Sequence, residues 1–453
     1  MVSDLAARLD RAAEVFSRRR RLEQMLTFEA SLARALARVD STTPEIVEAI
    51  VAQCDATLYD AEQLAHDAVG AGNEAIPLVE RLRARVAEAN ADAAPLVHCG
   101  ATSQDVIDTA LMLQLREGLA LYDAELRRLM FALADLAVAE SETVMVARTW
   151  LQHALPTTFG FKVATWLDGV HRAARRIRDC RSVLAVQFGG AVGTLAALGH
   201  DGPAIAAALA SELGLPMAAA PWHTTRDRVA EIAGAIGVLT GTLGKIARDI
   251  ALHAQSEIDE LREPAIAGRG RSSTMPHKRN PVGCASILAA AVRMPGLVST
   301  ILAGMVQEYE RALGGWQAEW ETMPEIGRLG LEALAHTTQI VSGLEVDRAR
   351  MASNLEATRG AVFSEAVSFA LAAHVGGEAK THVWRALRRA ASENRHLRDV
   401  LKDDREIGAH LSKSDVDRLF DPRNYLGVAP EVTRRVVERA RAFAGEGQRG
   451  AGR

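Results

Sequence analysis

Apolar residues at helical spacing dominate the middle of the chain. Between positions 232 and 250 they recur every three or four residues, which places them on one face of a long helix. Four further stretches show the same period: 111–136, 163–184, 285–306 and 324–343. Pro295 lies inside one of them and is expected to kink that helix. The pattern therefore predicts five long helices arranged as an extended bundle.

The pattern changes toward both ends of the chain. Residues 1–100 hold shorter helical patterns, and residues 345–453 hold short helices and an Asp421-Pro422 turn. We therefore predict an all-α fold of three helical domains, with boundaries near 100 and 344, around the central five-helix bundle. The apolar stripes of the long helices are wider than one bundle can bury, which favours association of identical copies.

Composition narrows the classes of function. Aromatic residues make up only 4% of the 453 residues, and the formal net charge is −4. A charge this small does not indicate a nucleic-acid or membrane partner. The first residues are amphipathic and lack the apolar core of a signal peptide, and the four cysteines show no metal-binding spacing. We expect a cytoplasmic protein without a cysteine-based metal site.

Three polar segments interrupt the apolar helices. The segment 98–105 contains His98, Thr102 and Ser103 just before a predicted helix, where free backbone N–H groups favour an anion. Helix capping by Ser103 or Asp105 is the structural alternative. The segment 148–160 places a cation, an imidazole, an amide and hydroxyls in a turn beside a helix. Here the alternative is that His153 is a core histidine.

The third segment, 268–281, is a glycine-punctuated loop that carries two serines, a lysine and an asparagine. Removing a proton next to a carboxylate requires this combination. The carboxylate gains negative charge, so donors and a cation must surround it, and a closing loop must exclude water. The sequence therefore predicts carbanion-type chemistry at this loop.

The string SSTMPHKRNP at 272–281 resembles the signature of the fumarase/aspartase superfamily, which includes adenylosuccinate and argininosuccinate lyases. The strings HCGATSQDVIDTA at 98–110, RTWLQHALPTTFG at 148–160 and ERALGGWQAEWETMPE at 310–325 extend the resemblance to nearly the whole chain, and they are most similar to the cycloisomerase branch. The resemblance implies a homotetramer with a 20-helix core, whose active sites each combine the three polar segments from three subunits. It also implies a small polycarboxylate substrate, lactonised during breakdown of aromatic compounds without a cofactor or a metal.

The resemblance also implies roles for individual residues. Ser272 matches the catalytic serine, which exchanges the proton next to a carboxylate, and Lys278 stabilises the charge. His98 and His153 are the candidate general acids. The implied substrate-binding residues are Thr102, Ser103, Gln152, Thr157, Arg226, Ser273, Met275, Asn280 and Arg311.

Several positions depart from the family pattern. Hydrolyase and ammonia-lyase members have a histidine where this chain has Trp150, and a glutamate that orients it where this chain has Ala285. Losing both removes the family's usual acid, which suits a carboxylate leaving group that needs little protonation. Arg271 replaces a usual glycine, Tyr309 a usual histidine and Thr225 a usual glutamine, and these changes leave the exact substrate open.

Three alternatives to lactonisation stay open. A related lyase could release fumarate by eliminating a good leaving group such as nitrite, with the same serine. An adenylosuccinate-type elimination is disfavoured by Trp150 and Ala285. A non-catalytic structural protein, as in some lens crystallins, is disfavoured by the presence of Ser272, Lys278 and Asn280 together.

Overall fold

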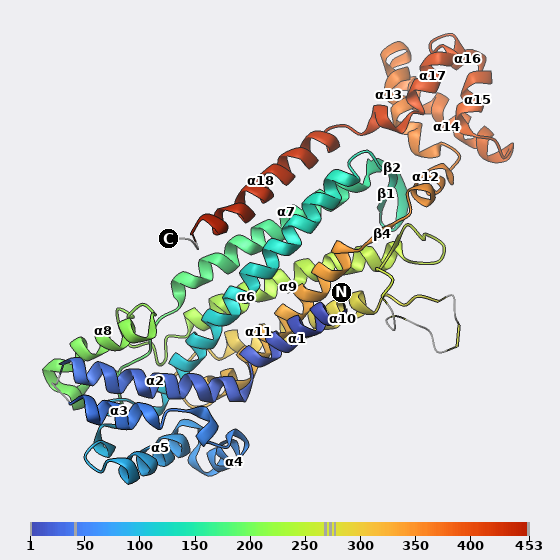
Figure 1. Cartoon of the computed structure of the whole chain (residues 1–453). Coiled ribbons are helices and arrows are strands. Elements are labelled where there is room, and N and C mark those ends of the chain that lie inside the picture. Colours follow the sequence, from blue (N-terminus) through green and yellow to red (C-terminus); the bar gives the residue numbers. More distant parts are fainter. Residues whose placement is uncertain (1, 40–42, 267–269, 271–273, 276–277, 451–453) are drawn as a thin grey trace. The chain divides into compact units, whose positions relative to one another are not determined.

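The structure of the chain is a computed structural model (Figure 1). It describes the chain apart from residues 1, 40–42, 267–269, 271–273, 276–277 and 451–453, and apart from the side chains of 2–3 and 447–450. The α-helices are α1 Val2–Val15, α2 Arg18–Val39, α3 Pro44–Ala52, α4 Ala61–Ala71, α5 Ala75–Ala89, α6 Ser103–Ala139, α7 Phe159–Asp179, α8 Gly202–Leu213, α9 Asp227–His253, α10 Val282–Ala303, α11 Gly315–Ser342, α12 Arg348–Glu356, α13 Ser364–Val375, α14 Ala379–Ser392, α15 Leu397–Asp403, α16 Arg405–Gly408, α17 Lys413–Leu419 and α18 Ala429–Gly450. The predicted all-α class is confirmed.

The five predicted long helices are present as α6, α7, α9, α10 and α11. Their apolar stripes are buried where the period places them: Ile232, Ile236 and Leu239 of α9 are each at most 1% exposed. Helix α11 begins nine positions earlier than its apolar stripe predicted, at Gly315. Pro295 lies inside α10, as expected, and the kink itself stays a prediction.

Strands were missed by the sequence analysis in two places. Strands β1 (Val144–Thr149) and β2 (Gln152–Thr158) pair antiparallel as a hairpin, with Val144 opposite Thr158 and Thr149 opposite Gln152. The short strands β3 (Leu261–Arg262) and β4 (Glu345–Val346) also pair antiparallel. Residues 148–158 of the second polar segment therefore lie in a hairpin, where a turn was expected, and residues 159–160 begin the expected neighbouring helix α7.

The chain divides into two compact units, each built from three separate stretches. Unit 1 contains residues 1–125, 173–243 and 287–335. Within it, α2 lies beside α3 and α8 (Figure 1). Buried apolar residues such as Met25, Leu26 and Phe28 form the packed side of α2. The turn before α6 also belongs to this unit, so unit 1 carries the first polar segment.

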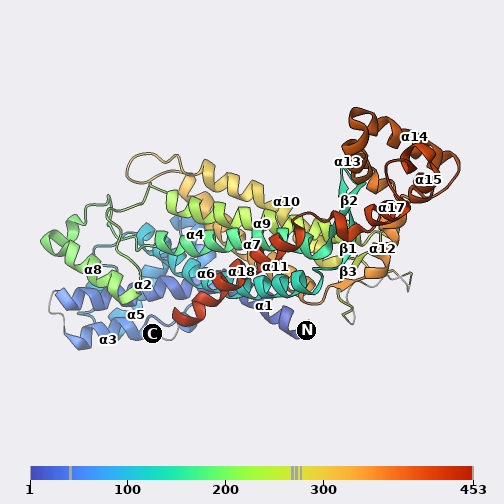
Figure 2. The same ribbon diagram turned by 90° about the horizontal axis from the view of Figure 1, so that it is seen from above.

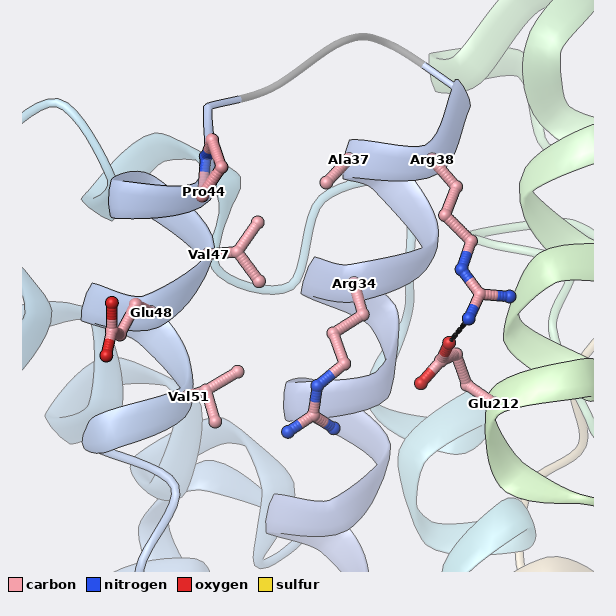
Figure 3. A pocket seen from close by; sticks show the side chains of 8 residues that line it. All are labelled: Arg34, Ala37, Arg38, Pro44, Val47, Glu48, Val51 and Glu212. Atoms are coloured by element: carbon pink, nitrogen blue, oxygen red, sulfur yellow. Dashed lines mark ion pairs between the residues drawn. The ribbon is translucent and has the colours of Figure 1, made fainter.

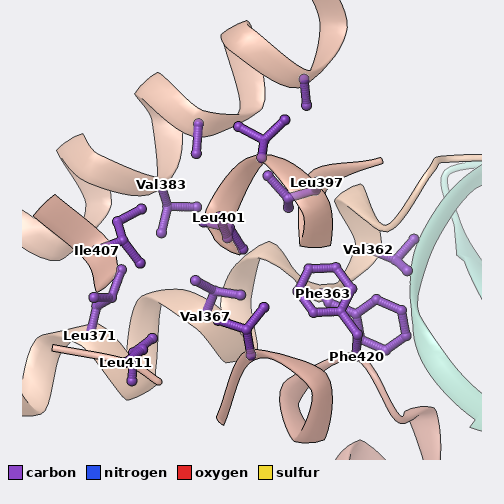
Figure 4. Close-up of a cluster of buried hydrophobic side chains, with 14 of the residues drawn as sticks. Val362, Phe363, Val367, Leu371, Val383, Leu397, Leu401, Ile407, Leu411 and Phe420 are labelled. Atoms are coloured by element: carbon purple, nitrogen blue, oxygen red, sulfur yellow. The ribbon is translucent and has the colours of Figure 1, made fainter. Parts of the chain in front are cut away.

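Unit 2 contains residues 126–172, 244–286 and 336–453. Helices α13 to α17 gather into one cluster (Figure 2) around buried apolar side chains that include Phe363, Val367, Leu401 and Phe420 (Figure 4). Helix α18 runs along α7, where Phe443 contacts the ring of His171 at 5.0 Å between centroids. Unit 2 carries the hairpin and the base of the glycine-punctuated loop. The three-domain division predicted from the sequence stays a prediction.

Among the described residues, two helices are long and apolar enough to cross a membrane by length and composition alone. In α9 the most apolar 18-residue window is 61% buried inside the chain, as in the core helix of a globular protein. In α10 the corresponding window is only 22% buried. Helix α10 therefore presents an apolar face that this chain alone does not cover.

Candidate active site

At the turn before α6, the side chain that caps the helix is not one of the two side chains that carry hydroxyl groups. The Asp105 carboxylate accepts a hydrogen bond from the Thr102 N–H at 3.0 Å, so it caps the helix from its third position. It also accepts hydrogen bonds from the N–H groups of Gly189 and Gly190, and it lies 2.7 Å from Nε2 of His223. The structural alternative is therefore confirmed for Asp105. The hydroxyls of Thr102 and Ser103 are left for other partners.

Those hydroxyls bind Arg311. Its guanidinium donates to Thr102 Oγ1 at 2.6 Å and to Ser103 Oγ at 3.3 Å, although 209 positions separate Arg311 from Thr102. Two hydroxyls, a cation and the first turn of α6 thus meet at one place in unit 1. This arrangement favours binding of a carboxylate.

His98 lies in the same turn and has a buried partner that the sequence analysis missed. Its Nδ1 lies 2.7 Å from Oε1 of Glu29 on α2, and Glu29 is 2% exposed. The two residues are 69 positions apart, and no spacing rule connects them. His98 therefore belongs to a histidine–carboxylate pair in unit 1.

Arg226 is placed differently from the other predicted binding residues. It is 1% exposed, and its guanidinium donates to both oxygens of Asp108 at 2.7 and 3.0 Å and to Glu319 at 3.0 Å. Its guanidinium is thus paired with two carboxylates inside unit 1, where it links the residue before α9 to α6 and α11. This geometry gives Arg226 a structural part; a contact between Arg226 and substrate stays a prediction.

The hairpin positions Gln152, His153 and Thr157 in unit 2. His153 pairs with Arg148 across the hairpin, and Gln152 begins β2 directly after the tip. The tip residues Trp150 and Leu151 have φ of 53° and 64° and are 98% and 81% exposed. Bulky side chains are strained in this left-handed region. The residue that replaces the family histidine therefore stands at a strained, exposed tip.

Glu260 holds the hairpin through Arg148 of β1. The sequence analysis did not identify Glu260 as part of the site. Its carboxylate accepts two hydrogen bonds from Arg148 at 2.8 and 2.9 Å, one from Asn354 of α12 at 2.8 Å, and contacts Nδ1 of His253 at 2.6 Å. Burial raises the pKa of Glu260, but the hydrogen bonds from His253, Arg148 and Asn354 outweigh it and lower the pKa to about 2. Glu260 is thus a carboxylate at any physiological pH.

The same surroundings act on His153. Burial, followed by the positive charge of Arg148, lowers the pKa of His153, and the negative charge of Glu260 only partly opposes this. The lowered pKa favours neutral imidazole at neutral pH, which is a weaker proton donor than imidazolium.

The glycine-punctuated loop is closed at its base. The Asn280 N–H donates to the Gly270 carbonyl at 2.8 Å, and Gly270 has φ of 68°. A Cβ on Gly270 would lie 2.6 Å from the Asn280 carbonyl oxygen, so only glycine fits. The Lys278 N–H donates to the Met275 carbonyl. Ser272, Ser273 and Arg271 lie outside the described residues.

Arg279 fastens this loop base to the rest of unit 2. Its guanidinium binds both oxygens of Glu345 at 2.8 Å and the Glu263 carbonyl at 2.6 Å. The Glu263 carboxylate in turn accepts the N–H groups of Gly283 and Cys284 at the start of α10. Arg279 therefore has a structural role beside the predicted charge-binding role of Lys278.

The predicted site residues fall into two groups. Thr102, Ser103, Arg311 and His98 come together in unit 1, whereas Gln152, His153, Thr157, Met275, Lys278 and Asn280 belong to unit 2. A pocket between α2, α3 and α8 contains none of them (Figure 3). Its Arg38 is paired with Glu212, and we assign this pocket no function.

The comparisons with known proteins identify the family. A sequence model of the lyase family matches residues 5–296, and one of the adenylosuccinate lyase C-terminus matches residues 360–436. The first match alone covers more than half of the chain. The chain therefore belongs to the fumarase/aspartase superfamily of lyases, as its motifs predicted.

Individual relatives are similar over nearly their whole length. The 3-carboxy-cis,cis-muconate cycloisomerase of Pseudomonas aeruginosa is 52% identical over 94% of this chain and 93% of its own. The crystal structure of the 3-carboxy-cis,cis-muconate lactonizing enzyme from Pseudomonas putida matches this chain with a TM-score of 0.91. The match covers 95% of this chain and 97% of that one, and the two sequences are 46% identical. Nitrosuccinate lyase from Streptomyces davaonensis is 39% identical over 92% of this chain and 90% of its own.

Proposed function

We propose that this protein is a 3-carboxy-cis,cis-muconate cycloisomerase that forms 4-carboxymuconolactone. The observation that carries the proposal is the 52% identity to a cycloisomerase of that name over nearly the full length of both proteins. The anion site of Thr102, Ser103 and Arg311 supports a polycarboxylate substrate. The reaction belongs to the breakdown of aromatic compounds, and a cytoplasmic location is part of the proposal.

The proposed mechanism uses the residues in the roles that the family resemblance implies. A carboxylate oxygen of the substrate adds to one end of a conjugated double bond, and the electron pair of that bond moves to the neighbouring carbon and its carboxylate. Lys278 and Asn280 stabilise this charge, and Ser272 delivers the proton to carbon. Thr102, Ser103 and Arg311, with Gln152 and Thr157, hold the remaining carboxylates.

The assembly is proposed to be a homotetramer in which three subunits contribute to each site. The uncovered face of α10 supports this, because Val292 and Leu302 are 78% and 52% exposed and Arg293 is the only charged residue of the helix. Apolar patches of this kind mark interfaces between proteins. Packing of α10 against copies of itself would cover this face and bring the two groups of site residues together.

A second candidate is elimination of nitrite from nitrosuccinate to give fumarate. The 39% identity to nitrosuccinate lyase favours it, because nitrite is also a leaving group that needs no strong acid. Trp150 and Ala285 are compatible with both reactions.

Two assays distinguish the candidates. Purified protein mixed with 3-carboxy-cis,cis-muconate is expected to remove the ultraviolet absorbance of the conjugated diene. Ser272→Ala is expected to lower kcat by about 10³-fold or more, because the group that moves the proton is lost. Fumarate formed from nitrosuccinate, with no change in diene absorbance, would replace the first proposal by the second. Undiminished turnover by Ser272→Ala would refute the serine mechanism for both.

A further inference from the structure

The pair formed by His98 and Glu29 joins two distant parts of unit 1. Glu29 projects from α2, whereas His98 lies in the turn that leads to α6, and Nδ1 of the histidine is 2.7 Å from Oε1 of the glutamate. Glu29 is 2% exposed. Because a carboxylate accepts hydrogen bonds, Glu29 holds a proton on Nδ1 of His98. The other ring nitrogen, Nε2, faces away from Glu29.

Stability does not explain a carboxylate at this position. The neighbouring buried residues of α2 include Met25, Leu26, Phe28 and Leu32, so the packed side of this helix is largely apolar. The second oxygen of Glu29, Oε2, is buried and has no hydrogen-bond partner among the described residues. Burying an incompletely paired carboxylate opposes folding, because the charge loses its hydration without gaining a full set of hydrogen bonds. An apolar residue would fit this face better.

The backbone at His98 is also strained. Its φ is 64°, a left-handed conformation that is unfavourable for a residue with a Cβ. The His98 carbonyl accepts the Ala101 N–H at 3.2 Å, which closes the turn. Gly100 has no room for a side chain, because its Cβ would lie 2.5 Å from Leu198. The turn is thus held in a costly conformation, and strain of this kind concentrates at functional sites.

The same turn leads directly into the anion site. Thr102 follows His98 by four positions, and its hydroxyl binds Arg311. A substrate carboxylate bound by this hydroxyl and Arg311 would therefore lie at the end of the turn that orients the imidazole. Among the described residues, the His98 ring is hydrogen-bonded only at Nδ1, so Nε2 remains for the ligand.

The other candidate acid lacks these features. His153 is exposed on the hairpin, and no described carboxylate bonds to its ring. It faces Arg148, whose positive charge disfavours a second cation beside it. Of the two histidines, only His98 has a buried carboxylate among the described residues that holds its ring.

We infer that His98, carrying a proton on each ring nitrogen while it lies between Glu29 and the bound substrate, is the catalytic residue that donates a hydrogen bond from Nε2 to the substrate carboxylate oxygen that makes or breaks the bond to carbon, and that Glu29 is its positioning residue. The inference rests on the proposed function. In lactone opening the C–O bond breaks, its electron pair stays on that oxygen, and the proton on the adjacent carbon passes to Ser272. The His98 N–H stabilises the new carboxylate without leaving the imidazole, and ring closure is the reverse.

Four variants test the inference: Glu29→Gln, His98→Ala, the double variant of both, and Glu125→Gln as a control. Glu125 is a buried carboxylate of unit 1 that pairs with Arg8 instead of a histidine. Glu29→Gln is expected to lower kcat about 10- to 100-fold with KM changed by less than about 3-fold, as for loss of an orienting partner. Glu125→Gln should leave kcat within about 3-fold of the native enzyme.

The double variant gives the decisive comparison. If Glu29 acts through His98, the double variant has the same kcat as His98→Ala, because there is no imidazole left to position. The inference would be overturned if the loss in kcat of the double variant were the product of the losses of the two single variants. Equal losses in kcat for Glu29→Gln and Glu125→Gln would also overturn it. Circular dichroism and thermal unfolding confirm that each variant is folded. If the native protein does not turn over the muconate, the proposed function fails instead, and the same cycle is then read with nitrosuccinate.

Discussion

Two kinds of polar residue at the α6 terminus perform different tasks. Asp105 satisfies the free backbone N–H of Thr102 and those of the 189–190 turn, so the helix end is stable without the hydroxyl groups. Thr102 and Ser103 can then bind Arg311. The sequence pattern allowed either helix capping or anion binding: Asp105 is the capping residue, and anion binding by Thr102 and Ser103 stays a prediction.

Acid stability can be predicted from Glu260. Its pKa of about 2 in the folded chain lies below the ordinary value of 4.5, so it stabilises the fold above about pH 4.5, and this contribution is lost as the pH falls toward 2. The difference of about 2.5 pKa units corresponds to about 3 kcal/mol. We expect Glu260→Gln to lower the free energy of unfolding at pH 7 by this order, and to flatten its decline between pH 5 and pH 2.

Urea unfolding at several pH values measures both effects. Asp403→Asn is the control, because Asp403 forms an exposed ion pair with Arg395 and should contribute little. If the native protein and Glu260→Gln lose stability in parallel below pH 5, another group controls acid unfolding.

The sequence could supply the local part of the site but not its buried partners. Thr102, Ser103 and Lys278 were found because each lies in a short string with a recognisable order of residues. Glu29 and Glu260 lie 69 and 112 positions from the residues that they bind. Pairings of this length depend on how helices pack, which a single sequence does not state.

At the scale of elements, the long helices were predictable and the hairpin was not. The helices repeat one apolar period over more than twenty residues. The hairpin has a Trp-Leu tip in place of the usual Asn-Gly, and Pro156 lies within β2, where proline argues against a strand. Both signals that normally identify a hairpin are therefore missing.

The strained tip gives a prediction about this element. Replacing Trp150 and Leu151 together by Asn and Gly, the residues that a two-residue turn with positive φ prefers, should raise the free energy of unfolding by about 1–2 kcal/mol. Activity should also fall, because the family resemblance implies that Trp150 stands at a position of the active site. Chemical denaturation and steady-state kinetics measure the two changes. Leu155→Thr, an exposed residue in β2 without positive φ, should not stabilise. A destabilised Asn-Gly variant would contradict this account of the tip.

At the scale of the whole molecule, the uncovered face of α10 yields a test of assembly. Val292→Lys should hardly affect an isolated chain, in which this side chain is 78% exposed, but it should break a tetramer by placing a charge in its core. We expect a lower native mass by light scattering together with loss of activity. The control is Val69→Lys on α4, where the valine is 86% exposed and lies outside the long helices. A tetrameric, active Val292→Lys variant would place the interface elsewhere.

The assignment of alternating stretches to the two units bears on how the protein is synthesised. Unit 1 needs residues up to 335, and unit 2 needs stretches on both sides of residues 173–243. During translation neither unit can be completed from the first third of the chain, and the apolar stripe of α6 must wait for partners made much later. Such non-local pairing slows folding and prolongs exposure of aggregation-prone surfaces. Fragments cut at residues 100 or 344 should therefore be insoluble when expressed separately, and chaperones should raise the yield of the intact polypeptide.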